Sequence, residues 1–158
     1  MSWSFIRVHP RPKRRASTND RARHHVISEL MRSQPHPAVF AWAASQPRAS
    51  LYTTSINCAE ILFGIRALPE GRRRTALANA AAAMFDEELG GRILPFEAAA
   101  AARCAEIVVD RRSFGAPIEA FDALIAATAS VAGAAVATRD ISGFEGCGLS
   151  LVNPWESP

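Results

Sequence analysis

Cysteine is scarce in this sequence, and its spacing builds no recognisable framework. Cys58, Cys104 and Cys147 are the three cysteines among 158 residues, and no C-x-x-C pair occurs. An odd number of scattered thiols argues against a disulfide framework. We therefore expect a protein of the reducing cytoplasm.

Long apolar segments are also missing. Residues 1–20 contain no apolar core of the kind found in a signal peptide. The charge-free stretch 123–138 is interrupted by Gly133 and is shorter than the roughly 20 residues of a membrane helix. The chain also has no P-loop, no G-x-G-x-x-G motif and no internal repeat. We expect no membrane span, and these common phosphate-binding motifs are excluded.

Positive charge is concentrated at one end of the chain. Residues 1–25 hold seven Arg and Lys against Asp20 alone, a net charge of +6, whereas the remaining residues carry eleven basic and fourteen acidic side chains, a net charge of −3. We expect residues 1–25 to be a basic, disordered or non-native segment and residues 26–158 to form one domain. The basic segment is either an arm that contacts nucleic acid or a solvated tail.

Short apolar runs alternate with helical patterns downstream of Val26. This alternation is typical of an α/β domain with a mostly parallel sheet. Strands are predicted at residues 50–54, 93–95, 134–137 and 149–152, and helices at residues 26–31, 55–65 (with Ser55 as N-cap), 72–89, 97–112 and 118–128.

Two acids flank the most regular of these units, residues 118–140. Asp122 lies near the start of the predicted helix, and Asp140 lies just past the carboxyl end of the predicted strand. Ligands of open α/β sheets bind at the carboxyl ends of the strands, so the two carboxylates can converge there. A further acid, Glu60, stands in an otherwise apolar helix. Clustered carboxylates are suited to a hard divalent cation.

Each acid also has a structural interpretation. Glu60 can pair with an arginine, Asp122 can cap its helix, and Asp140 can be a turn residue after a strand. Glu119 lies one turn before Asp122 and either supports the site or is a solvated acid of the first turn. Thr138 can orient a carboxylate or serve only the strand end.

Five short segments occur together in a characteristic order: residues 28–32, 55–64, 121–129, 137–140 and 152–155. In this combination residues 26–155 resemble the PIN-domain family, specifically the VapC/FitB-type toxins of bacterial toxin–antitoxin pairs. The resemblance implies a three-layer α/β/α fold and a ribonuclease that hydrolyses RNA with Mg²⁺ or Mn²⁺. It also implies a cognate antitoxin and a homodimer. By position, Glu60, Asp122 and Asp140 match three of the family's four acidic metal-site residues, which makes them the candidate catalytic residues.

The fourth acid is absent from the sequence. The family's first, central strand ends in Asp-Thr-Asn directly before a Val-Ile-Ser-Glu segment, whereas here Arg23, His24 and His25 precede Val26. We therefore expect the first strand to be missing or malformed, and Arg23 to compete with the metal. Two functions stay open: an impaired ribonuclease, or an inactive toxin remnant that only binds an antitoxin or a partner subunit.

A shifted reading frame would explain this departure. The codons GAC ACC AAC, read one base earlier and with one A lost, become CGA CAC CAC, which encode Arg-His-His. We expect resequencing of the gene to reveal, in the alternative frame upstream of Val26, a short apolar strand that begins at a start codon. The hypothesis fails if that frame encodes no such strand.

Overall fold

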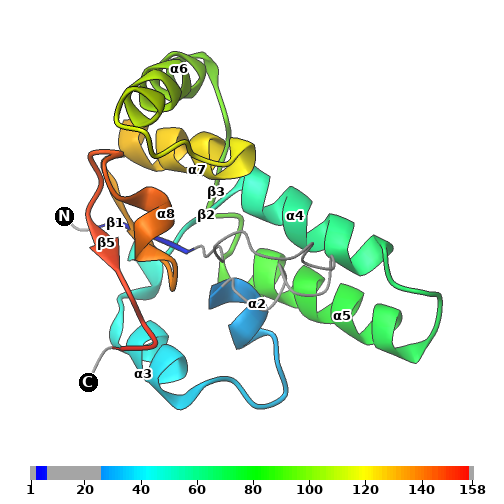
Figure 1. The fold of residues 1–158 in the computed structure, drawn as a ribbon. Coiled ribbons are helices and arrows are strands. Elements are labelled where there is room, and N and C mark those ends of the chain that lie inside the picture. Colours follow the sequence, from blue (N-terminus) through cyan, green and yellow to red (C-terminus); the bar gives the residue numbers. More distant parts are fainter. Residues whose placement is uncertain (1–2, 7–25, 157–158) are drawn as a thin grey trace.

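The computed structural model of this chain describes residues 26–156 and, as a backbone strand, Trp3–Ile6 (Figure 1). The strands are β1 (Trp3–Ile6), β2 (Thr53–Thr54), β3 (Ile93–Leu94), β4 (Ala134–Ala137) and β5 (Leu151–Val152). The helices are α2 (Val26–Leu30), α3 (Pro37–Ser45), α4 (Ser55–Arg66), α5 (Arg72–Ala83), α6 (Ala98–Ser113), α7 (Ala120–Val131) and α8 (Ile141–Phe144). A 3₁₀ turn covers Arg48–Ser50, and a π-helical turn covers Met84–Glu88.

All the strand pairs in the described residues are parallel, as the α/β pattern predicted. β1 pairs with β4 and β4 pairs with β5 in one sheet, while β2 and β3 form a second, two-stranded sheet. β1 also contacts β2, although no hydrogen-bonded ladder joins these two strands. The strands therefore follow the order β3-β2-β1-β4-β5, with the ladder interrupted in the middle.

The helices form two groups with the short strands between them, which gives the three-layer α/β/α arrangement expected from the sequence. One core cluster is built by α6, α7, α8 and β4 and includes the fully buried side chains of Ile107, Ile125 and Phe144. The other is built by α2, α3, α4 and α5 around Val39 and Ile61.

The unit formed by α7 and β4 follows its sequence pattern closely. All four residues of β4 are buried, as expected of a parallel strand covered on both faces. Gly133 lies between the two elements with φ +64°, the left-handed conformation that glycine adopts after a helix without steric cost. The helix and the strand can therefore pack directly on one another.

The first strand differs from the prediction. We expected it to be missing or malformed, because the residues directly before Val26 are polar. In the structure β1 comes from Trp3–Ile6, whose residues are paired one to one with Ala134–Ala137. Trp, Phe and Ile are good strand formers, and this four-residue run lay too far upstream of Val26 to be considered. The first strand is therefore not missing, although it forms a ladder on one side only, with β4.

Other expectations about the first 25 residues fall on residues 7–25, which lie outside the described part of the chain. The helix predicted over residues 72–89 is α5 followed by the π-helical turn at Met84–Glu88. Among the described residues, none of the helices has the length and apolar character needed to cross a membrane.

Candidate functional site

Asp122 is a buried acid at the start of a buried helix. It lies in the first turn of α7, and only 2% of its surface is exposed. Burial of a carboxylate is costly without compensation. The free N–H groups and the positive end of the dipole at a helix start supply part of that compensation. The fold therefore holds this acid where negative charge is best tolerated.

Glu60 lies on α4, the helix that follows β2. The N-cap of α4 is Thr54, one residue before the predicted Ser55, and the Thr54 Oγ1 atom accepts a hydrogen bond from the Asn57 backbone N–H at 3.0 Å. The cap anchors the helix at the carboxyl end of β2. Glu60 lies about one turn further along and is partly buried. Because α4 packs against α7, Glu60 and Asp122 are carried by neighbouring helices.

Asp140 caps the short helix α8. Its Oδ1 atom accepts hydrogen bonds from the Gly143 backbone N–H at 3.0 Å and from the Ser142 hydroxyl at 2.8 Å. Its own backbone N–H donates to the Oγ1 atom of the buried Thr138 at 3.1 Å. The turn role considered for Asp140 is therefore present, and Thr138 fixes the backbone at the strand end.

Helix α7, which carries Asp122, packs against both α4, which carries Glu60, and α8, which Asp140 caps. Among the described residues, however, no group of three or more His, Cys, Asp or Glu side chains could hold a metal ion. By donor type the three carboxylates suit Mg²⁺ or Mn²⁺. Their arrangement in the described part of the chain does not amount to a closed coordination site.

Comparison with known proteins identifies the scaffold. Residues 24–145 match the PIN domain family. The chain is 43% identical over 131 residues to a VapC ribonuclease of Sinorhizobium fredii, covering 83% of this chain and 94% of the relative. The chain belongs to the PIN-domain family.

Further comparisons place it among the VapC/FitB-type toxins of that family. Toxin FitB of Neisseria gonorrhoeae is 36% identical over 130 residues, which cover 82% of this chain and 94% of the toxin. A solved structure of FitAB bound to a DNA fragment superposes with a TM-score of 0.78 at 35% identity, covering 84% of this chain and 93% of that one.

Arg111 is a residue of this PIN domain that the sequence analysis missed. It lies in the last turn of α6, only 8% of its surface is exposed, and its guanidinium donates to the Glu145 carbonyl. Longer contacts reach the carbonyls of Ser142 at 3.5 Å and Gly143 at 3.4 Å. A signal was available in the sequence, because Arg111 lies one turn after Ile107 on the buried face of α6.

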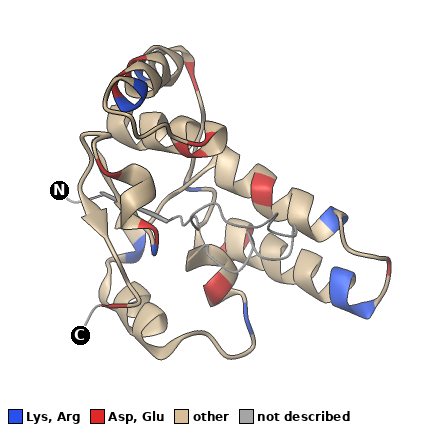
Figure 2. Ribbon diagram, viewed as in Figure 1, with Lys and Arg blue, Asp and Glu red and all other residues tan. Residues whose placement is uncertain are grey.

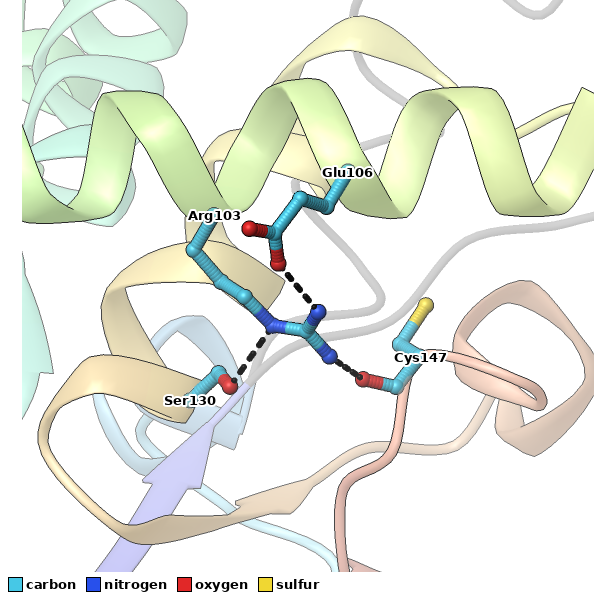
Figure 3. A network of polar contacts seen from close by, with 4 residues as sticks. All are labelled: Arg103, Glu106, Ser130 and Cys147. Atoms are coloured by element: carbon cyan, nitrogen blue, oxygen red, sulfur yellow. Dashed lines mark hydrogen bonds and ion pairs between the residues drawn. The ribbon is translucent and has the colours of Figure 1, made fainter.

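Arg103 makes a second attachment from the same helix (Figure 3). Its Nε–H donates to the Ser130 hydroxyl at 3.1 Å, and its two terminal nitrogens donate to the Glu106 carboxylate at 2.8 Å and to the Cys147 carbonyl at 3.2 Å. Arg103 therefore joins α6, the end of α7 and the segment that follows α8.

The remaining charged candidates lie elsewhere. Glu119 is exposed and makes no side-chain cap hydrogen bond, which agrees with a solvated acid. Arg72 and Arg73 are exposed at the start of α5 (Figure 2), and Arg74 pairs with Glu70 at 3.7 Å. These arginines form a solvated helix start, whereas Arg23, His24 and His25 lie outside the described residues.

The thiols are not candidate nucleophiles. Burial raises the pKa of Cys58 to about 11, against a smaller lowering by a backbone hydrogen bond. Desolvation also raises the pKa of Cys104 and of Cys147. These thiols stay protonated at neutral pH, and the thiolate is the reactive form.

Replacing Gly143 with Ala should release the Asp140 cap. A Cβ at Gly143 would lie 2.8 Å from Asp140 Oδ2, so the carboxylate must shift, which should weaken its hydrogen bond with the Gly143 N–H. Alanine favours a helix at both positions, so we expect G143A to be about 1 kcal/mol less stable than the variant Gly64→Ala, the usual value of a lost N-cap. Urea denaturation measures this change.

Gly64→Ala is the matched control, because a Cβ at this position in α4 meets nothing within 4 Å. It should leave stability unchanged or raise it by up to about 1 kcal/mol, since Ala favours a helix interior. A G143A variant as stable as G64A would contradict the assigned role of Asp140 as a cap.

Proposed function

We propose that this chain is the toxin of a type II toxin–antitoxin pair, a PIN-domain endoribonuclease that hydrolyses RNA phosphodiester bonds in the cytoplasm. The observation that carries the proposal is the 43% identity to a VapC ribonuclease over 94% of its length. The burial of Asp122 at a helix start adds support. Desolvating a carboxylate is unfavourable, so buried acids are found preferentially at functional sites.

The proposed cofactor is Mg²⁺ or Mn²⁺, with Glu60, Asp122 and Asp140 as its ligands. When bound, such an ion offsets negative charge on the scissile phosphate and lowers the pKa of a bound water. The protein contributes orientation. Asp140 is fixed through two hydrogen bonds to its Oδ1 atom, and Asp122 lies buried in the first turn of α7.

We further propose that activity is impaired in this chain. Three carboxylates stand where the family uses four, and no set of three among the described residues is arranged as a metal site. The ladder between β2 and β1 is interrupted. In the family the first acid follows the central strand, so this interruption also favours impaired activity. The second candidate function, an inactive remnant that binds an antitoxin, rests on the same observations.

The proposed partners are a cognate antitoxin and a second copy of the chain. The apolar stretches 39–42 and 61–65 are the proposed contact surfaces. Within them Phe40 of α3 is 58% exposed, and Leu62 and Phe63 of α4 are 44% and 65% exposed, whereas Ile61 is buried. Large apolar side chains left in solvent on a helix are typical of a surface that another helix covers.

Cleavage of an RNA substrate tests the enzymatic proposal. The unmodified chain should cleave weakly in Mg²⁺, because one ligand is missing. Replacing residues 1–25 with an apolar strand that ends in Asp-Thr-Asn should raise the rate by about 100-fold, since stabilisation of charge by a metal contributes several kcal/mol. Arg23→Asp alone should restore little, because no strand would aim the new carboxylate.

Asp122→Asn in both backgrounds is the control for this experiment and should remove the remaining metal-dependent cleavage. Full Mg²⁺-dependent activity of the unmodified chain that is lost in D122N would show that three acids suffice. Absence of cleavage in every version, with antitoxin binding retained, would favour the inactive remnant.

Sedimentation velocity tests assembly. We expect the isolated chain to be a dimer and to bind its antitoxin. Phe63→Asp should weaken either dimerisation or antitoxin binding, because it places a charge on the exposed apolar surface of α4. Val109→Asp is the matched control, since Val109 is 64% exposed on α6, away from the proposed surface. A strict monomer at high concentration, or equal effects of F63D and V109D, would contradict the assignment.

A further inference from the structure

The helix α8 is too short to be stable alone. It contains one turn, Ile141–Phe144, and a single turn fixes several residues for very few hydrogen bonds. Three contacts outside its own backbone hold it in place: the Asp140 cap at its start, the fully buried side chain of Phe144, and the guanidinium of Arg111.

The hydrogen bonds of this turn divide between the backbone and Arg111. The Ile141 carbonyl accepts from the Glu145 N–H at 3.0 Å, and the Phe144 carbonyl accepts from the Cys147 N–H at 3.2 Å. The carbonyls of Ser142, Gly143 and Glu145 are those that Arg111 contacts. Arg111 therefore donates to the carbonyls that accept no backbone hydrogen bond within this segment. The last carbonyls of a helix usually require such an outside donor.

Arg111 is dedicated to this segment. Among the described residues its hydrogen bonds go to backbone carbonyls alone, and its Nε–H has no partner. Burying a cation without an acidic partner is unfavourable. A side chain that only filled the space beside Ile107 would be apolar, so the charge is explained by the carbonyls that it meets.

Two residues link Arg111 directly to Asp140. Gly143 donates its N–H to Asp140 Oδ1 at 3.0 Å, and its carbonyl accepts from Arg111 Nη2 at 3.4 Å. The Ser142 hydroxyl donates to the same oxygen at 2.8 Å, and the Ser142 carbonyl accepts from Arg111 Nη2 at 3.5 Å. The Ser142 hydroxyl and the Gly143 N–H orient the Asp140 carboxylate, and the Arg111 guanidinium holds the carbonyls of the same two residues.

We infer that Arg111 is a positioning residue for Asp140, acting through the single turn of α8. The inference rests on the proposed function in taking Asp140 as a metal ligand. Arg103 assists by holding the Cys147 carbonyl at the end of the same segment. Helix α6, which carries none of the predicted ligands, thereby sets the geometry of one of them.

Amide hydrogen exchange of the full chain tests this inference without reference to activity. Arg111→Met keeps much of the side-chain volume and removes the donors. We expect exchange at the Gly143 amide to rise by about tenfold, because the turn loses hydrogen bonds to a charged group. Exchange at Val136 and Thr138, whose amides are bonded to the β5 strand region, should not change. Arg111→Lys, which keeps a charged donor, should give a smaller rise at Gly143.

Arg112→Met is the matched control, because Arg112 is the exposed neighbour of Arg111 on the same helix. It should leave exchange at Gly143 unchanged. Titration with Mn²⁺ is the second measurement. R111M should weaken Mn²⁺ binding by about tenfold or more, approaching the effect of Asp140→Asn, whereas R112M should not.

Unchanged exchange at Gly143 in R111M would overturn the inference, and so would an equal rise in R112M. If R111M loses protection throughout β4, the Lys variant decides: a selective rise at Gly143 supports positioning, and no rise overturns it. If the unmodified chain binds no Mn²⁺, the metal part of the proposed function fails, while the exchange data still decide whether Arg111 holds the Asp140 turn.

Discussion

The packing of α7 directly on β4 is the constraint on which the candidate site depends. A strand buried on both faces needs apolar neighbours, and α7 meets this need with Ala123, Ile125, Ala126, Ala127 and Ala129, all at most 1% exposed. A helix buried to this extent tolerates an acid best in its first turn, where free N–H groups and the dipole favour negative charge. The depth of the core and the position of Asp122 are therefore two consequences of the same packing.

Asp140 has both a structural role and a proposed functional role. Its carboxylate is at once the cap of α8 and a candidate metal ligand, so the orientation of the ligand depends on the integrity of one helical turn. That turn is held from the far side by arginines of α6. Gly143 fits this arrangement, because the side chain of any other residue would begin within 3 Å of the carboxylate. The site thus extends well beyond the acids themselves.

The hydrogen-bonded ladder of the sheet is interrupted in its middle, between β2 and β1. A central strand of a parallel sheet normally forms ladders on both sides, and β1 forms one, with β4. The resemblance implies an acid shortly before Val26, where Arg23, His24 and His25 stand in this sequence. The scaffold of a PIN-domain toxin is therefore present, and our proposal is that its carboxylate set is one member short.

Several features followed from the sequence because they depend on neighbouring residues. The burial of β4, the left-handed glycine after α7 and the alternation of helices with parallel strands are set by local periodicity and by backbone sterics. The combination of short motifs was sufficient to predict the family. Boundaries were less accurate, since Thr54 caps α4 in place of Ser55, and a π-helical turn ends the helix predicted to reach residue 89.

Other features were decided only by tertiary structure. The strand at Trp3–Ile6 was not predicted, because its partner β4 lies more than a hundred residues away. The role of Arg111 was not predicted either, because the carbonyls that it contacts are 31 to 34 residues further along the chain. Whether a buried cation is tolerated depends on groups that only packing brings to it, and a local pattern carries no information about them.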